Sequence, residues 1–339
     1  MQKKIAVIYT GEVRTIETTI KYFKENVLIN NDFHVFATLQ SNNIAYFDQF
    51  VKDNLGDHLK SIVWLDKNDE TWISIREELI NKIVNVSDRW KDYLKNSGSM
   101  IEYYQVYLAF KNIEEYEKAN SIKYDYVMRI RCDLVLTHPI YFNWDDYSLD
   151  IVKEYLYDIK NEKNLETIVC REVFITFMNS FYHKNRMLCK NISYENNQNS
   201  ETFKQIMNII ECNEIDYNEI ENIETNKENI FLNAVYNYLL NGNYAVTLRK
   251  NQIFFMKRHL FTNIAELGVT YGAHTTTNND WWFNAESQLE IIIMKNGMDI
   301  FESVNKIEGD SIYSYNEHNY FENNELKKTH EILFFLKRD

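Results

Sequence analysis

The chain has 339 residues, of which 45% are hydrophobic and 15% aromatic, enough for a sizeable core in one large domain or two small ones. The aromatic content argues against a disordered chain. The formal net charge of −13 argues against a duplex nucleic-acid partner, because such proteins present a basic field.

The first part of the chain alternates between apolar runs and helical periodicity. An opening apolar run ends in TGEVRT, which predicts a buried strand followed by a turn. Apolar residues then recur at helical spacing from Thr15 to Val27, and two further apolar runs predict strands. The order strand, helix, strand, strand, then helix is typical of an α/β domain with a largely parallel sheet. The three predicted strands cover residues 3–9, 32–40 and 61–66.

A long helix is predicted next, beginning at Ser99, whose spacing to Glu102 matches a capping box. It leads into a further strand within 124–139. The rest of the chain is less regular. It contains a strand-like run at 167–179, a helix at 226–242, one or two strands at 244–258, a polar aromatic loop at 270–288 and a last strand at 330–338.

Cysteine usage and hydropathy indicate the compartment. The four cysteines are far apart and form no CxxC pair, which favours free thiols in a reducing environment. The N-terminus turns polar too soon for a signal peptide, and no apolar run approaches the roughly 20 residues of a membrane span. We therefore expect a cytoplasmic protein without a membrane span. The cysteines are Cys132, Cys170, Cys189 and Cys212.

Charged residues interrupt the strand YDYVMRIRCDLVL. With the period of two that strands follow, Arg129, Arg131 and Asp133 share one face. In one explanation, the arginines pair with Asp133, Asp125 or carboxylates elsewhere, because an unpaired buried arginine is costly. In the other, Asp133 ends a central strand where α/β sheets bind ligands, and holds a divalent cation beside an anionic ligand. The charge pattern alone leaves both open.

Several of these segments, taken in order, resemble a known enzyme group. IAVIYTGEVRT, DFHVFATL, the long helix and YDYVMRIRCDLVL resemble the GT-A-type nucleotide-sugar glycosyltransferases of bacterial surface-polysaccharide clusters and large DNA viruses. That group shows a strand ending in G-x-x-R-T and a later strand of the form Y-D-Y-x-x-R-x-R-x-D-L. The resemblance covers residues 3–140, and more weakly 226–240.

The resemblance implies a GT-A-like, Rossmann-type α/β sandwich, with a mixed, mostly parallel central sheet flanked by helices. It implies one domain over 1–339, with a nucleotide-sugar-binding half at 1–140, an acceptor-side half at 141–300 and a C-terminal extension at 301–339. If the gene is viral, the expected location is the host cytoplasm. The oligomeric state stays open.

The resemblance also implies a donor site at the first turn. A helix N-terminus offers free N–H groups to a diphosphate, Gly11 lets the backbone come close, and Arg14 adds a positive charge. The alternative is that Gly11 is only a turn glycine and Arg14 a surface residue. The donor-binding set implied by the resemblance is Tyr9, Thr10, Gly11, Arg14, Thr15, Arg129 and Arg131.

A Mn²⁺ or Mg²⁺ ion is implied by the D-x-D motif of that group, whose last carboxylate corresponds to Asp133. Arg131 replaces the first carboxylate, so the metal is either weakly held or partly replaced by the arginine charge. His274 is the first candidate to complete the metal shell, with His259 second. An ordinary polar or surface role is the alternative for either histidine.

The remaining expectations concern catalysis. Glu228, at the start of a predicted helix, is the candidate general base and Glu172 its competitor; an ordinary first-turn carboxylate is the alternative. The aromatic run at 280–283 suits either sugar binding or packing.

The expected function is sugar transfer from a nucleotide-diphosphate donor to a glycan or glycoprotein acceptor, with stereochemistry open. The alternative is a catalytically inactive GT-A-like protein that binds a glycan or nucleotide. An oxidoreductase is disfavoured because no G-x-G-x-x-G follows the first strand.

Overall fold

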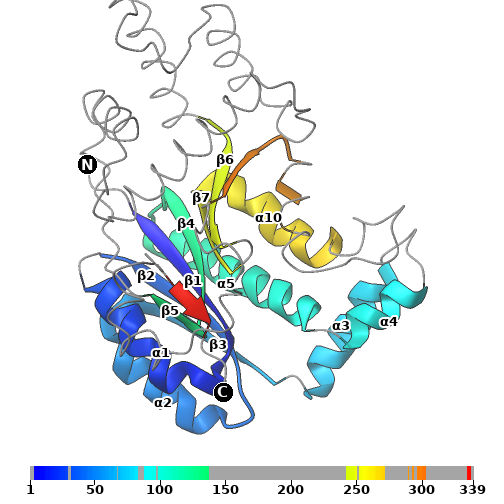
Figure 1. Cartoon of the computed structure of the whole chain (residues 1–339), viewed down its shortest axis with the longest axis horizontal. Coiled ribbons are helices and arrows are strands. Elements are labelled where there is room, and N and C mark those ends of the chain that lie inside the picture. The colour runs from blue at the N-terminus through cyan, green and yellow to red at the C-terminus, as the bar shows by residue number, and fades with distance from the viewer. Residues whose placement is uncertain are drawn as a thin grey trace, which may run out of the picture.

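Among the described residues, a seven-stranded mixed sheet forms the centre of the fold (Figure 1), with strand order β3-β2-β1-β4-β7-β6-β8. The computed structural model describes residues 4–29, 32–66, 68–82, 88–96, 98–136, 242–249, 252–271, 289, 292–293, 296–302 and 334–336. The strands are β1 (Ile5–Glu12), β2 (His34–Gln40), β3 (Leu59–Leu65), β4 (Tyr126–Arg131), β6 (Tyr244–Arg249), β7 (Ile253–Lys257) and β8 (Asp299–Glu302). A separate pair joins β5 (Leu134–Leu136) to β9 (Phe334–Leu336).

The sheet is mostly parallel. Strands β3, β2, β1 and β4 run parallel to one another, whereas β7 is antiparallel to both of its neighbours, and β6 is parallel to β8. Because its central strands are covered on both faces, β1 is apolar on both, with residues 5–10 all buried. The predicted Rossmann-type α/β sandwich with a mixed, mostly parallel sheet flanked by helices is confirmed.

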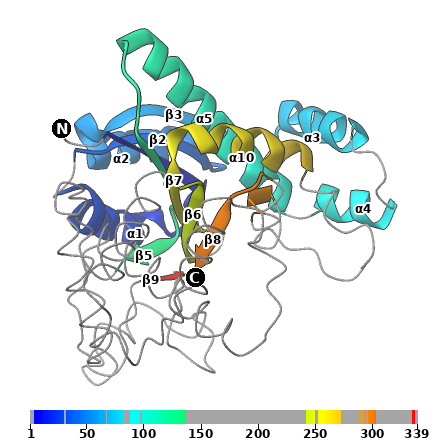
Figure 2. The ribbon, with the colours of Figure 1, turned by 90° about the horizontal axis from the view of Figure 1, so that it is seen from above.

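Helices cover both faces of this sheet. Seen from above, α5 and α10 lie on one side, and α1 lies on the other side with the β5–β9 pair (Figure 2). Helices α3 and α4 pack on each other and on the first turns of α5. The helices are α1 (Ile16–Phe23), α2 (Ile44–Leu55), α3 (Glu70–Lys82), α4 (Asp88–Asn96), α5 (Ser99–Asn120) and α10 (Arg258–Tyr271). Short 3₁₀ helices at Val13–Thr15 and Gly56–His58 and a π-helical segment at Lys24–Leu28 complete the described elements.

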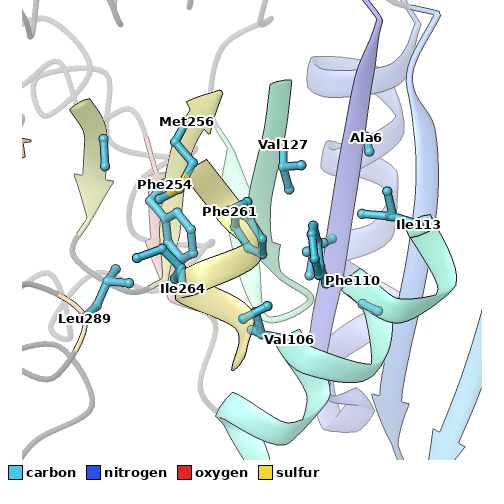
Figure 3. Packing of buried hydrophobic residues seen from close by; sticks show 14 of the residues in the cluster. Ala6, Val106, Phe110, Ile113, Val127, Phe254, Met256, Phe261, Ile264 and Leu289 are labelled. Carbon is cyan, nitrogen blue, oxygen red and sulfur yellow. The ribbon is translucent and has the colours of Figure 1, made fainter. Parts of the chain in front are cut away.

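The main core lies between the sheet and the α5–α10 pair (Figure 3). Phe110 of α5 and Phe261 of α10 meet at a ring-centroid distance of 5.2 Å, and Phe254 of β7 stacks on Phe261 at 5.7 Å. Ala6 and Val127 present small side chains of β1 and β4 to the same cluster. The first turns of α5 lie close to the strand ends, since Gln105 Nε2 donates to Gly11 O at 3.4 Å and Glu102 Oε1 accepts from Arg129 Nη2 at 2.7 Å.

Four helices, α2, α3, α4 and α10, were not located from the sequence. Helix α2 lies between β2 and β3, where no helix was predicted, and α10 follows β7 without an intervening turn. The predicted capping box of α5 is wrong: its N-cap is Gly98, without a side-chain cap, and the Glu102 carboxylate binds Arg129. The strand-like run at 167–179, the helix at 226–242 and the loop beyond Tyr271 lie outside the described residues.

The predicted division into two halves and an extension stays a prediction. Two strands from near the C-terminus nevertheless join the described core. The edge strand β8 pairs with β6, and β9 pairs with β5, which directly follows β4 and Asp133. None of the helices in the described part of the chain has an apolar stretch long enough to cross a bilayer.

A histidine at the start of β2 predicts a pH effect on stability. The His34 ring lies 2.5 Å from the Tyr124 hydroxyl, and burial, aided by Lys60, lowers the pKa of His34 below its ordinary value. The unfolded chain therefore binds more protons than the folded one as the pH falls below about 6.5, and this contribution destabilises the fold there. Replacing His34 with Gln should make the free energy of unfolding, measured by urea denaturation, less dependent on pH between 7.5 and 5. An unchanged pH dependence in H34Q would contradict this.

Candidate nucleotide-binding site

The candidate site lies at the carboxyl ends of β1 and β4, which are neighbours in the sheet. Their register pairs Thr10 with Arg131. The chain leaves β1 for β2 on one side, whereas β4 lies on the other side of β1, so the strand order reverses here. In open α/β sheets, ligands bind beyond the carboxyl ends of the strands at such a switch point. The start of α1 adds its N-terminus to the same corner.

Arg129 is enclosed between the sheet and α5. Its side chain is only 1% exposed, and its Nη2 donates to Glu102 Oε1 at 2.7 Å. Its Nε donates to Thr10 Oγ1 at 3.3 Å. For Arg129, the structural explanation of the charged strand is therefore correct. The carboxylate involved belongs to α5, whereas Asp125 accepts a hydrogen bond from the Lys4 amide instead.

Arg131 and Asp133 form a bidentate pair. Arg131 Nε donates to Asp133 Oδ1 at 2.9 Å, and Arg131 Nη2 donates to Oδ2 at 2.6 Å. Two more charges lie near: Glu102 Oε1 is 3.6 Å from Arg131 Nη1, and Arg14 Nη2 is 3.9 Å from Asp133 Oδ2. Burial alone would lower the pKa of Arg131, but the Glu102 and Asp133 carboxylates outweigh it and raise that pKa, so the guanidinium stays charged.

Three arginines and two carboxylates thus form one chain of contacts. It runs from Arg129 through Glu102 to Arg131, and on through Asp133 to Arg14. Among the three arginines, exposure rises in this order: the side chain of Arg129 is 1% exposed, that of Arg131 20% and that of Arg14 44%. Of the three arginines, Arg14 and Arg131 are therefore the two that a ligand can reach directly. The buried Arg129 binds Glu102, which in turn lies next to Arg131.

Gly11 is held by the neighbouring strand. Its φ of +138° is one that L side chains rarely adopt, and an added Cβ would lie 2.8 Å from Cys132 Sγ. Cys132 N donates to Thr10 O at 2.8 Å, which keeps the two strand ends together. Burial raises the pKa of the Cys132 thiol, so it stays neutral and acts as a packing group.

The first turn of α1 is tied to the end of β4. Thr19 Oγ1 donates to Cys132 O at 2.5 Å, and the ring of Tyr9 stacks on Phe23 with centroids 4.4 Å apart. Tyr9 is buried, and burial raises the pKa of its hydroxyl. The buried Thr15 Oγ1, next to Arg14 in the sequence, has no hydrogen-bond partner among the described residues.

Most of the predicted site residues meet in this corner, although burial separates their roles. Tyr9, Thr10 and Arg129 are buried within the fold, whereas Arg14 is exposed and Gly11 and Arg131 are partly so. Asp133 is 2% exposed. The residues brought together are Tyr9, Thr10, Gly11, Arg14, Thr15, Arg129, Arg131 and Asp133.

The other predicted residues do not join them. Glu228, Glu172 and His274 lie outside the described residues. His259 is in the first turn of α10, two residues after Lys257, which pairs with Tyr126 at the beginning of β4. The full length of β4 therefore separates His259 from Asp133, and His259 is not placed to share a metal with it.

Glu102 was missed as a member of the site. Its spacing from Ser99 suggested a capping role, and that interpretation concealed the long-range pairing with Arg129. A buried arginine needs a carboxylate partner, and the helix preceding the strand was the nearest source of one. Within the part of the chain that the structure describes, no group of three or more His, Cys, Asp and Glu residues could hold a metal ion.

Comparison with known proteins adds little. No protein-family model matches the chain, and no curated protein matches it. Among solved structures, the glycosyltransferase GlyE of Streptococcus pneumoniae TIGR4 is similar, with a TM-score of 0.39 and 10% sequence identity. The match covers 100% of this chain and 55% of that one, so the chain spans about half the length of GlyE. A similarity of this extent assigns no activity, and the function is argued from the site.

Proposed function

We propose that this protein is a glycosyltransferase, which moves a sugar from a nucleoside-diphosphate donor to a hydroxyl of a glycan or glycoprotein. The observation that carries the proposal is the pair of accessible guanidinium groups, Arg14 and Arg131, at the switch point beside the start of α1. Planar guanidinium groups bind phosphate oxygens through paired hydrogen bonds, and helix N-termini favour anions. The order of the motifs in the sequence supports the same assignment.

In the proposed reaction, the bond between the sugar anomeric carbon and the β-phosphate oxygen breaks, and its electron pair leaves with the nucleoside diphosphate. A new bond joins that carbon to the acceptor oxygen, whose proton passes to a carboxylate. Glu228 is the first candidate for this base and Glu172 the second. Arg14 and Arg131 stabilise the negative charge that develops on the diphosphate, which is the kind of contribution that preorganised charges make most effectively.

A second candidate is a catalytically inactive protein of the same fold that binds a nucleotide or glycan. The observation in its favour is that Arg131 occupies the place of a carboxylate and fully engages Asp133. Such a protein would bind the nucleotide and release no product. Measuring nucleoside diphosphate released from nucleotide sugars, alone and with glycan acceptors, separates the two candidates.

The first test is thermal stability with UDP, GDP, CMP, TDP and ADP. A ligand that binds only the folded state raises stability by about 2.7 kcal/mol at a hundredfold excess over Kd. We expect one nucleotide to raise the melting temperature of the wild type. The R14Q variant should bind it about tenfold more weakly, because a charge-assisted hydrogen bond is lost.

R89Q is the matched control, since Arg89 is exposed on α4 outside the site. It should bind like the wild type. If no nucleotide stabilises the wild type at millimolar concentration, the proposed function is wrong. If R14Q and R89Q bind equally well, the site is misplaced.

A further inference from the structure

We infer that the donor diphosphate is held by arginine side chains rather than through a divalent cation bound to Asp133. In this arrangement, Asp133 is a positioning residue that orients the guanidinium of Arg131. The inference rests on the proposed function, and it narrows the chemistry of the same site. It departs from the Mn²⁺ or Mg²⁺ that the sequence resemblance implies.

The groups around Asp133 do not suit a hard cation. Such an ion takes six or more oxygen ligands, and a Mg²⁺ ion at a phosphate site usually needs one or two carboxylates whose oxygens are free to bind it. Both oxygens of Asp133 already accept hydrogen bonds from Arg131, at 2.9 and 2.6 Å. The nearest other charge is the guanidinium of Arg14, 3.9 Å from Oδ2, and a second cation there would be repelled. Glu102 Oε1, the other nearby carboxylate oxygen, is engaged by Arg129 at 2.7 Å.

The same groups suit an oxyanion. Arg131 donates two N–H groups to Asp133, and its Nη1 lies 3.6 Å from Glu102 Oε1. The two carboxylates therefore hold the plane of the Arg131 guanidinium from two sides. Arg129, itself held by Thr10, fixes Glu102 in turn. A guanidinium held in one orientation loses less side-chain entropy when it binds phosphate than a free one does.

Arg14 supplies the second positive charge from α1. Its guanidinium is substantially exposed, and its contact with Asp133 is long, at 3.9 Å, so it can turn toward a ligand. Beside it, Thr15 has a buried hydroxyl without a partner among the described residues. Two arginines, one fixed and one adjustable, supply the two positive charges that would otherwise come from one divalent metal.

The experiment measures the affinity of D133N and the wild type for UDP, or for whichever nucleoside diphosphate the panel selects, in EDTA and in Mn²⁺. The wild-type protein should bind equally well in both. D133N keeps the shape of the side chain but holds Arg131 less firmly. We expect it to bind about threefold to tenfold more weakly, by the same factor in EDTA and in Mn²⁺.

A metal ligand would behave differently: D133N would weaken binding only where Mn²⁺ is present. That result, or wild-type binding that requires Mn²⁺, would overturn the inference while leaving the proposed function standing. Absence of nucleotide binding both in EDTA and in Mn²⁺ would overturn the inference and the proposed function. R14Q provides a second test that does not depend on a buried side chain, since it should weaken binding about tenfold in EDTA as well. R14Q binding as tightly as the wild type in EDTA would overturn the inference.

Discussion

Replacing Glu102 with alanine is expected to destabilise the fold by about 3–5 kcal/mol, the cost of removing one partner of a buried ion pair. Arg129 would then be a buried cation whose side chain is only 1% exposed, and its hydrogen bond to Thr10 Oγ1, at 3.3 Å, supplies no counter-charge. Burying such a charge without a counter-charge is among the largest penalties that a single substitution imposes. Urea denaturation of E102A measures it.

The matched control is E266A. Glu266 lies on the surface of α10 and pairs with Lys111 at 3.3 Å, so its loss should cost less than about 1 kcal/mol. A second comparison is the double variant E102L/R129M, in which apolar groups replace the pair. It should recover most of the stability lost in E102A, because a buried pair replaced by apolar groups is often neutral. Equal costs for E102A and E266A would contradict the assignment of a buried pair.

The double variant also separates stability from binding. Glu102 Oε1 lies 3.6 Å from Arg131 Nη1, so Arg131 is held less firmly when Glu102 is removed. E102L/R129M should therefore fold well and still bind the nucleoside diphosphate more weakly than the wild type does. A stable double variant that binds normally would show that the Arg129–Glu102 pair serves the fold alone.

The strands were predictable because their signal is local. A strand buried on both faces is a short apolar run, and such runs mark β1, β2 and β4 in the sequence. The edge strand β3 is only partly buried, but it also contains an apolar run. Helix α5 was predictable for the same reason, since its length gives the periodicity many repeats. The pairing of Arg131 with Asp133 was predictable as well, because only one residue separates them and the period of a strand places both side chains on one face.

The missed helices lack such a signal. Helix α2 buries only Val51 and Leu55, too few to mark an apolar stripe. Helix α10 begins directly after the apolar run of β7, with no cap residue or turn to announce it. The pairing of Glu102 with Arg129 joins residues 27 positions apart, and only the packing of α5 on the sheet brings them together.

Gly11 also shows that a sequence does not reveal tertiary contacts. The sequence suggested a glycine that lets the backbone approach a diphosphate, and that role is still a prediction. The structure gives the glycine a further role, because Cys132 of the adjacent strand end occupies the space that a Cβ would need. A turn glycine can be identified in a sequence, whereas the neighbour that requires it cannot.

Replacing Gly11 with alanine should cost about 2–5 kcal/mol, as the sum of backbone strain and overpacking against Cys132. G56A is the matched control, because Gly56 also has a positive φ, of +50°, but has nothing within 4 Å of an added Cβ. It should cost only about 1–2 kcal/mol, from the backbone conformation alone. Urea denaturation of both variants gives the difference, which measures the clash with Cys132.

Adding C132A to G11A removes the sulfur and should restore the overpacking part of the loss but not the backbone strain. The two sites should therefore couple by about 1–2 kcal/mol in a double-mutant cycle. If Gly11 served only the close approach of a diphosphate, G11A would keep its stability, show no coupling to C132A and lose nucleotide binding. If it serves the junction of β1 and β4, G11A loses stability first, and it loses binding because Arg14, three residues along the chain, is displaced with the end of the strand.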